Sequence, residues 1–244
     1  PTLRALADEA QRAHAKVYED SRPARVAFAP GRINLIGDHT DYVGGTCLPA
    51  CIDRYVVAAF RRREDKRVRI YSSSYDELLE FQLSGIRFDS EKGWLNYVMG
   101  VFREAAAMGH ALEGADITLV SSLPAASGLS SSAAVEAVSM AVVSALSPRE
   151  IPRNEWVGVC HRAENKFVGV PCGTLDQTAV IHGRDGHALF LDVAGGRHEA
   201  VPVPAGALAL VADTATRRSL AATPYARKRK AAEDAFRKLR KWEG

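Results

Sequence analysis

The spacing of apolar residues predicts a mixture of helices and strands. Helical periodicity predicts helices over residues 3–18, 94–109, 128–146, 153–167 and 225–241. Alternating or β-branched runs predict strands over residues 25–29, 54–60, 67–72, 116–121, 187–193 and 207–213. Pro30-Gly31 is expected to end the first strand and Asp53 to mark a turn before the second. Because helices and strands do not alternate as regular βαβ units, we expect an α+β fold rather than a Rossmann-type sheet.

Composition and charge narrow the class of protein. The chain has 244 residues, of which 47% are hydrophobic and 25% charged, which is ordinary globular usage and excludes a disordered, collagen-like or coiled-coil chain. The net charge of +3 hides an asymmetry, because residues 217–244 hold ten Lys and Arg against three acids. Such a basic end is typical either of a polyanion-binding segment or of a solvated helix.

Cysteine usage and hydropathy indicate where the protein works. The four cysteines show neither a CxxC pair nor zinc-ligand spacing, and so few thiols favour a reducing compartment. No apolar run approaches the roughly 20 residues that span a bilayer. The N-terminus lacks the apolar region of a signal peptide. We therefore expect a cytoplasmic protein that does not contact a membrane.

A serine-rich loop lies between a predicted strand and a predicted helix. It reads Leu123-Pro-Ala-Ala-Ser-Gly-Leu-Ser-Ser-Ser-Ala-Ala134. Gly128 permits a tight turn, and the serines add hydroxyls to the free N–H groups of a helix N-terminus, which binds phosphate well. It is not a Walker A loop, because no Gly-Lys-Ser/Thr follows. An anion site and a serine-rich helix cap both explain the pattern, although one serine suffices for a cap.

A dense polar turn occurs in the first third of the chain. Within residues 29–42, Arg32, Asn34, Asp38, His39 and Asp41 alternate with apolar residues that anchor the segment in a core. Carboxylates and a histidine supply the donors and acceptors that sugar hydroxyls require. A turn closed by an internal Arg–Asp pair is the alternative, but five polar residues beside two glycines favour a binding site.

A third cluster spans residues 164–177. Pro171-Cys172-Gly173 interrupts a predicted helix, so that Asp176 falls in the first turn of the next helix, near its positive end. Glu164 lies in the last turns of the preceding helix. The two carboxylates would serve as a base and a metal ligand, or as a helix-cap neighbour and a surface acid.

Taken together, the three segments resemble the GHMP kinases and, within them, the galactokinases. The polar turn resembles the signature Gly-Arg-x-Asn-x-Ile-Gly-Glu/Asp-His-x-Asp-Tyr, and the serine-rich loop resembles Pro-x-x-x-Gly-Leu-Ser-Ser-Ser-Ala. The third cluster resembles Glu-x-x-Phe-x-Gly-x-Pro-Cys-Gly-x-x-Asp-Gln. Weaker matches are Trp94-Leu-Asn-Tyr97 and the segment from Ser219 to Tyr225 that leads into the basic helix. The matches run in order from about residue 28 to 235.

The resemblance implies transfer of the ATP γ-phosphoryl group to the anomeric hydroxyl of galactose, with Mg²⁺ as cofactor. Asp176 would be the catalytic carboxylate, and Arg32 would neutralise charge beside it. Ser132 and Glu164 would hold Mg²⁺. The sugar contacts would be Asp38, His39, Asp41, Gly173 and Tyr225. The ATP contacts would be Ala126, Ser127, Gly128, Leu129, Ser130, Ser131 and Ser132, with Trp94 and Tyr97 at the adenine.

The resemblance also implies a domain organisation. Residues 1–205 would form an N-terminal domain like domain 2 of ribosomal protein S5, and residues 206–244 the start of a truncated ferredoxin-like C-terminal domain. The family's second Gly-rich loop is absent from the sequence. We expect a monomer that binds galactose and ATP, with no nucleic-acid partner. Because Asp38 stands where the family usually carries Glu, a kinase for a related sugar is one alternative. A silent sugar- and ATP-binding regulator is another, and the absent Gly-rich loop leaves open a fragment without function of its own.

Overall fold

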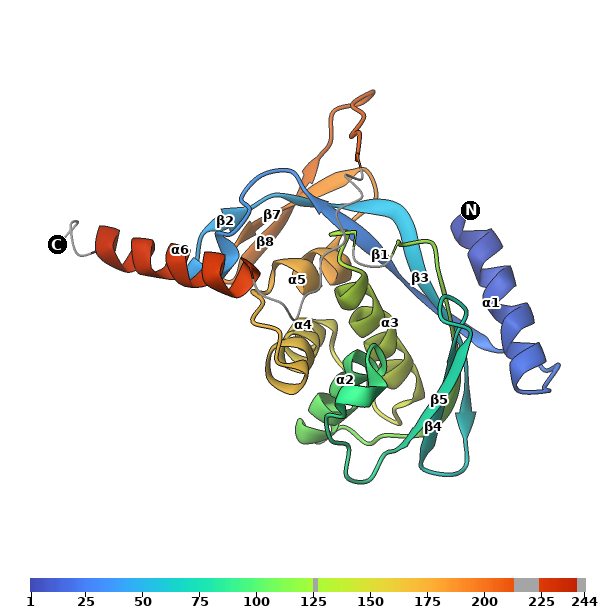
Figure 1. Cartoon of the computed structure of the whole chain (residues 1–244). Helices are drawn as coiled ribbons and strands as arrows, with labels where there is room; N and C mark the ends of the chain where they lie inside the picture. The colour runs from blue at the N-terminus through green and yellow to red at the C-terminus, as the bar shows by residue number, and fades with distance from the viewer. Residues whose placement is uncertain (125–126, 213–223, 241–244) are drawn as a thin grey trace.

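The computed structural model describes residues 1–124, 127–212 and 224–240. Its helices and strands follow one another in an irregular order (Figure 1). The helices are α1 (Leu3–Val17), α2 (Leu95–Ala107), α3 (Ser131–Leu146), α4 (Arg153–Arg162), α5 (Leu175–His182) and α6 (Pro224–Arg240). The strands are β1 (Arg25–Asn34), β2 (Thr46–Cys47), β3 (Pro49–Arg63), β4 (Arg67–Ser72), β5 (Glu77–Gln82), β6 (Gly114–Ser121), β7 (His187–Asp192) and β8 (Arg197–Pro202).

The strands form one mixed sheet of eight strands. Six of them follow the order β2-β7-β3-β6-β4-β5, while β1 pairs with β3 and β8 with β7. The β4–β6 pair is parallel, and the other described pairs are antiparallel. This arrangement confirms the expected α+β class, because a Rossmann sheet would be built of parallel strands.

Helices cover both faces of the sheet. Figure 1 shows α1 on one face and α2, α3 and α4 on the other. The alternation along β3 explains this, because neighbouring side chains of a strand point to opposite faces. Val57 and Ala59 pack against α1, whereas Val56, Ala58 and Phe60 belong to the larger core on the other face.

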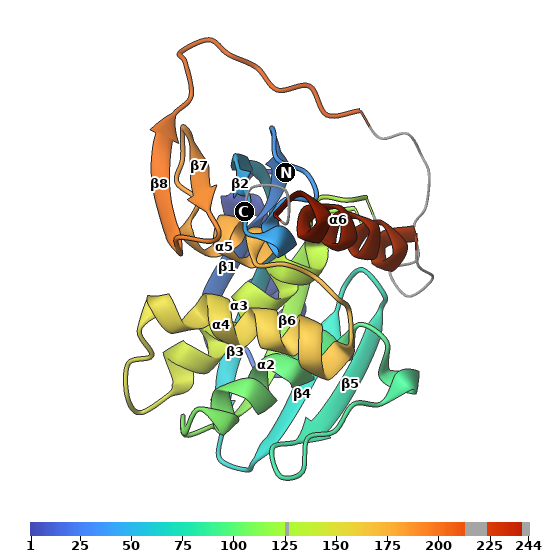
Figure 2. The same cartoon turned by 90° about the vertical axis from the view of Figure 1, so that its left-hand side faces the viewer.

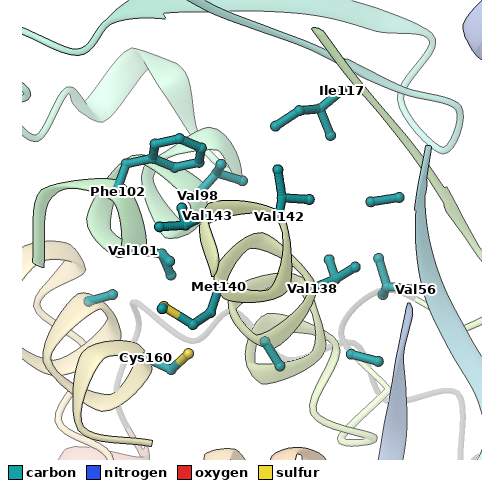
Figure 3. Close-up of a cluster of buried hydrophobic side chains, with 14 of the residues drawn as sticks. Val56, Val98, Val101, Phe102, Ile117, Val138, Met140, Val142, Val143 and Cys160 are labelled. Carbon is teal, nitrogen blue, oxygen red and sulfur yellow. The ribbon is translucent and has the colours of Figure 1, made fainter. Parts of the chain in front are cut away.

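The main core surrounds α3, which follows the serine-rich loop. Ala133, Ala134 and Val138 are fully buried, and Met140 lies among side chains from α2, α4 and the sheet (Figure 3). A helix that is apolar on most sides is stable only when it is buried. The central position of α3 fixes the serine-rich loop at one end of the core.

The structure corrects several boundaries predicted from the sequence. β1 does not end at Pro30-Gly31 but continues to Asn34, with a shift in register between Pro30 and Arg32. Asp53 lies inside β3 rather than in a turn. The helix predicted over 153–167 ends at Arg162 and continues as a π-helical turn, Ala163–Val168.

The last part of the chain differs most from the prediction. No strand occurs over residues 207–212 in the described structure, and Leu208 and Leu210 are almost fully exposed. Figure 2 shows this segment leaving β8 and passing away from the sheet before the chain reaches α6. The predicted basic helix is confirmed as α6. Among the described helices, none is both long and apolar enough to cross a membrane.

Candidate active site

An arginine and a carboxylate that lie far apart in the sequence meet between β1 and α5. The Nε and NH2 groups of Arg32 donate to Oδ1 of Asp176 at 2.8 and 2.5 Å. The pair is partly shielded, since 15% of the Arg32 side chain and 30% of the Asp176 side chain are exposed. The structure thus brings the two predicted catalytic residues into direct contact, as an accessible pair in which the charges offset each other.

The serine-rich loop is attached to the same pair. Arg32 donates from NH1 to the carbonyl oxygen of Gly128 at 2.8 Å and from its backbone N–H to that of Leu129 at 3.2 Å. The Ser130 hydroxyl donates to Oδ2 of Asp176 at 2.7 Å. A methyl group at Gly31 would lie only 2.9 Å from the Leu129 oxygen, so this irregular point of β1 lets the loop approach.

The conformation of the loop suits a backbone cradle. Gly128 has a φ of +77° and open space around it, and the Ser127 hydroxyl donates to the carbonyl oxygen of Pro124. Ser131 and Ser132 are the first residues of α3, so their N–H groups lie at the positive end of a buried helix. Of the predicted ATP contacts, Ala126 lies outside the described residues.

The predicted sugar contacts follow β1 in a turn. Asn34 donates from Nδ2 to Oδ1 of Asp38 at 2.7 Å. His39 has a positive φ of 63°, and its Nδ1 lies 2.7 Å from the hydroxyl of Tyr42. Asp38 and His39 are therefore oriented by their neighbours, and not by an internal Arg–Asp pair within the turn.

Asp41 connects this turn to the helix that carries Asp176. Its carboxylate lies against Gly173 and near the backbone N–H of Leu175, the first residue of α5. Burial, and then the nearby charge of Asp176, raises the pKa of Asp41. The structure therefore brings two of the predicted sugar contacts, Asp41 and Gly173, next to the predicted catalytic pair, Arg32 and Asp176.

A buried acidic group lies beside this site. Glu164 is 4% exposed, and its carboxylate accepts a hydrogen bond from Nε2 of Gln177 at 2.6 Å and lies near the hydroxyl of Ser132. The same Nε2 donates to Glu136, which is fully buried, at 3.1 Å. Burial, followed by the charge of Asp176, raises the pKa of Glu164 to about 7, and burial and Glu164 raise that of Glu136.

These residues fit a magnesium ion shared with a nucleotide. Ser132 and Glu164 offer neighbouring oxygen atoms, and a cation there would offset the repulsion among the acids. No group of three or more His, Cys, Asp or Glu suited to a metal occurs among the described residues. Mg²⁺ commonly takes one or two protein oxygens and completes its shell with phosphate and water. The described residues fit that pattern rather than an all-protein metal cage.

The predicted adenine contacts lie on α2 and just before it. Trp94 stacks on Tyr75, with ring centroids 5.8 Å apart, and donates from Nε1 to Glu77 at 3.1 Å. Tyr97 lies where the charges of Glu164 and Glu136 act on it, and burial raises the pKa of its hydroxyl. Tyr97 is thus near the acidic group, whereas Trp94 contacts the β4–β5 hairpin.

Helix α6 approaches the site from the C-terminal side. NH1 of Arg229 donates to the carbonyl oxygen of Cys172 at 3.3 Å, and its guanidinium lies 5.3 Å from the ring centre of Tyr42. The same carbonyl oxygen accepts a hydrogen bond from Asn165. α6 begins at Pro224, but the side chain of Tyr225 lies outside the described part of the structure.

Sequence reasoning missed several residues that the structure adds to the site. Glu136 is a single acid in a long apolar helix, and such an isolated charge is itself a signal. Gln177 directly follows the predicted catalytic carboxylate, Asp176. Tyr42 ends the first signature but was assigned no role, and no motif singled out Arg229, because the contact between them depends on where α6 packs.

Comparisons with known proteins agree with this geometry. The family model for the galactokinase galactose-binding signature matches residues 12–62, and that for the GHMP kinase N-terminal domain matches residues 96–184. The structure of Lactococcus lactis galactokinase complexed with galactose is 32% identical, has a TM-score of 0.86, and aligns with 98% of this chain and 62% of its own. Mevalonate kinase from Methanococcus jannaschii shares the fold with a TM-score of 0.62 at 16% identity, over 74% of this chain and 56% of its own.

Curated relatives show the same likeness. The galactokinase of Chloroflexus aurantiacus is 40% identical over 223 residues, which are 91% of this chain and 57% of the relative. The galactokinase of Thermococcus kodakarensis is 39% identical over 88% of this chain and 60% of its own length. The chain thus spans somewhat more than half the length of these relatives.

The fold is that of the GHMP kinases, and the matched N-terminal domain contains both the serine-rich loop and α5. The galactose-binding signature and the relatives narrow the class further. This chain belongs to the galactokinase family.

Proposed function

We propose that the protein transfers the γ-phosphoryl group of ATP to the anomeric hydroxyl of galactose, giving galactose 1-phosphate and ADP. The observation that carries the proposal is the Asp176 carboxylate, which contacts Arg32 on one oxygen and Ser130 of the serine-rich loop on the other. The Asp176 carboxylate thereby adjoins both the polar turn of residues 29–42 and the predicted phosphate loop.

In this reaction the sugar oxygen bonds to the γ-phosphorus while the bond from that phosphorus to the bridging oxygen of ADP breaks. Asp176 accepts the hydrogen bond of the attacking hydroxyl and then its proton, which passes to solvent. Arg32 offsets the negative charge that gathers around the carboxylate and the phosphoryl group. Phosphoryl transfer asks mainly for positioning and charge neutralisation, so a strong base is not required.

The remaining residues bind and orient the substrates. Asp38, His39, Asp41 and Gly173 take the sugar hydroxyls, together with Tyr225, while the loop from Ala126 to Ser132 takes the phosphates. Ser132 and Glu164 hold Mg²⁺, which when bound neutralises phosphate charge. Trp94 and Tyr97 border the adenine. The raised pKa of the unliganded Glu164 supports a role in which a cation takes the place of its proton.

We also propose a boundary between two structural units at residues 205/206 and a location in the cytoplasm. β8 ends at Pro202, and the exposed segment that follows leaves the sheet, which supports the boundary. The four cysteines are free, which is compatible with a reducing compartment. The monomeric state stays a prediction.

Binding and turnover test the proposed function separately. Calorimetry with galactose and with a non-hydrolysable ATP analogue measures each site, and ADP release with Mg·ATP is followed across a panel of sugars. We expect galactose to bind and to stimulate ADP release above every other sugar. Release stimulated best by another sugar would move the assignment to a related kinase, and binding of both ligands without release would indicate a silent regulator.

A further inference from the structure

Ser130 adopts a backbone conformation that serine rarely takes. It has φ and ψ of 59° and 45°, the left-handed region that favours glycine, and it is the residue that precedes α3. Strain of this kind persists only when the surrounding structure enforces it. A glycine would fit the same backbone without strain, so the serine side chain is what distinguishes this position.

The Ser130 side chain does not cap the helix that it precedes. A capping serine has extended backbone angles and accepts an N–H of the first turn with its hydroxyl. No such side-chain bond is made by Ser130, although its carbonyl oxygen accepts the first helical hydrogen bond, from Ala134, at 3.0 Å. Helix capping therefore does not explain the serine.

The hydroxyl instead donates to Asp176. Ser130 is only 7% exposed, and its Oγ lies 2.7 Å from Oδ2 of that carboxylate, while Arg32 binds Oδ1. Because each oxygen of the Asp176 carboxylate accepts a hydrogen bond from a different donor, the carboxylate is held in one orientation and does not rotate freely about its Cβ–Cγ bond. The same Arg32 contacts Gly128 and Leu129, so the loop and the carboxylate form one assembly.

We propose that Ser130 is a positioning residue that orients the Asp176 carboxylate toward the sugar hydroxyl, rather than a phosphate ligand through its side chain. The left-handed conformation turns its hydroxyl away from the helix and onto the carboxylate. Phosphates bound by the backbone of the loop are then aligned with the group that holds the attacking oxygen. This proposal rests on the proposed function and adds to it a link between the two substrate sites.

The test compares two substitutions that both remove the hydroxyl. Ser130→Gly also relieves the backbone strain, whereas Ser130→Ala retains it. We expect both to lower kcat by about tenfold to a hundredfold, the range that misplacement of a reacting group produces. The KM for ATP should stay within about twofold, and Gly should unfold at a higher urea concentration than Ala. Glu19→Gly, at an exposed position with φ of 52°, is the matched control and should leave kcat unchanged.

Three results would overturn the proposal. Recovery of kcat in Ser130→Gly but not in Ser130→Ala would assign only a backbone role to the residue. A loss of affinity for the ATP analogue equal to the loss of kcat in both variants would make the hydroxyl a phosphate ligand. Unchanged kcat in both variants would remove the role altogether.

A second measurement does not depend on turnover, so it separates this proposal from the proposed function. Urea unfolding is measured for Ser130→Gly, for Asp176→Ala and for the double variant. If the double variant shifts the urea midpoint by less than the sum of the shifts in the two single variants, the hydrogen bond between Ser130 and Asp176 is supported. This result would hold even in a chain that phosphorylates no sugar. Additive midpoints would contradict the proposal whatever the activity.

Discussion

Gly173 offers the sharpest test of how the polar turn of residues 29–42 is joined to α5, which carries Asp176. A methyl group at this position would overlap the carboxylate of Asp41, so Gly173→Ala must displace that side chain. The displaced carboxylate would also move away from the nearby N–H of Leu175 at the start of α5. Overpacking of a well-packed contact costs about 1–3 kcal/mol, so we expect the free energy of unfolding to fall by about 2 kcal/mol.

The same displacement should weaken galactose binding. If the lost contact to the sugar is worth about 1.4 kcal/mol, the dissociation constant rises about tenfold. The affinity for a non-hydrolysable ATP analogue should not change, because the displaced Asp41 carboxylate belongs to the polar turn and not to the serine-rich loop. Calorimetry gives both dissociation constants, and urea unfolding followed by circular dichroism gives the stability.

Gly158→Ala is the matched control for this substitution. Gly158 lies inside α4, where an added methyl group meets only NH1 at the far end of the Arg162 side chain, at 3.1 Å. Because alanine favours a helix over glycine by about 1 kcal/mol, the control should be at least as stable as the wild type and should bind galactose normally. Wild-type galactose affinity and stability in Gly173→Ala would refute the coupling between Asp41 and α5.

Three further predictions concern the charged groups. Arg32→Met should lower the free energy of unfolding by about 2 kcal/mol, a figure reduced because the Arg32–Asp176 pair is partly exposed. Adding Asp176→Asn should restore part of that stability. If urea unfolding shows that the two losses of stability simply add, the pairing is contradicted. Gln177→Leu leaves two buried acids, Glu136 and Glu164, without their shared donor, so we expect the free energy of unfolding to fall by about 3 kcal/mol. It should also weaken Mg²⁺ binding, measured by isothermal titration in the presence of an ATP analogue. Unchanged Mg²⁺ affinity would count against a role of Gln177 in orienting the acids for the metal. Burial, and then the charges of its neighbours, lowers the pKa of His182 to about 4 from the ordinary 6.5. Between these two pH values the unfolded chain binds a proton at His182 and the folded chain does not. The free energy of unfolding should therefore fall as the pH drops from 6.5 to 4. His182→Phe should flatten that dependence, and an unchanged slope would show that another group causes it.

Most of the fold was accessible from the sequence because its elements have strong local patterns. The apolar periodicity of α1 and α3 and the alternation in β3 identify the helices and the longest strand. Pro30-Gly31 misled the prediction, because a proline and a glycine inside a strand usually end it. Here a shift in register accommodates both residues, and the strand continues to Asn34.

The strand predicted at 207–213 failed for a different reason. Residues 207–212 form a continuous apolar run that is typical of a buried strand, but a strand needs a partner whose N–H and C=O groups complete its hydrogen bonds. In the described structure, residues 207–212 pair with no other strand and expose Leu208 and Leu210. Local pattern alone does not supply such a partner.

The site was predicted unevenly for physical reasons. The resemblance to the galactokinase motifs indicated Arg32 and Asp176, because each falls at a defined position of a motif that the sequence matches. The bond from Ser130 to Asp176 depends on one left-handed residue, and the pairing of Glu136 with Glu164 depends on how α3 and α5 pack. Contacts of this kind arise from the tertiary fold, so sequence spacing carried no direct sign of them.

The position of the transferred phosphoryl group tests the central claim most directly. The wild type and Asp176→Asn are incubated with Mg·ATP and galactose, and the product is analysed by phosphorus–proton correlation NMR. We predict a phosphorus signal coupled to the anomeric proton of the sugar in the wild type, formed together with one equivalent of ADP, and none in the variant. A phosphate coupled to another sugar carbon, or equal product from Asp176→Asn, would contradict the account.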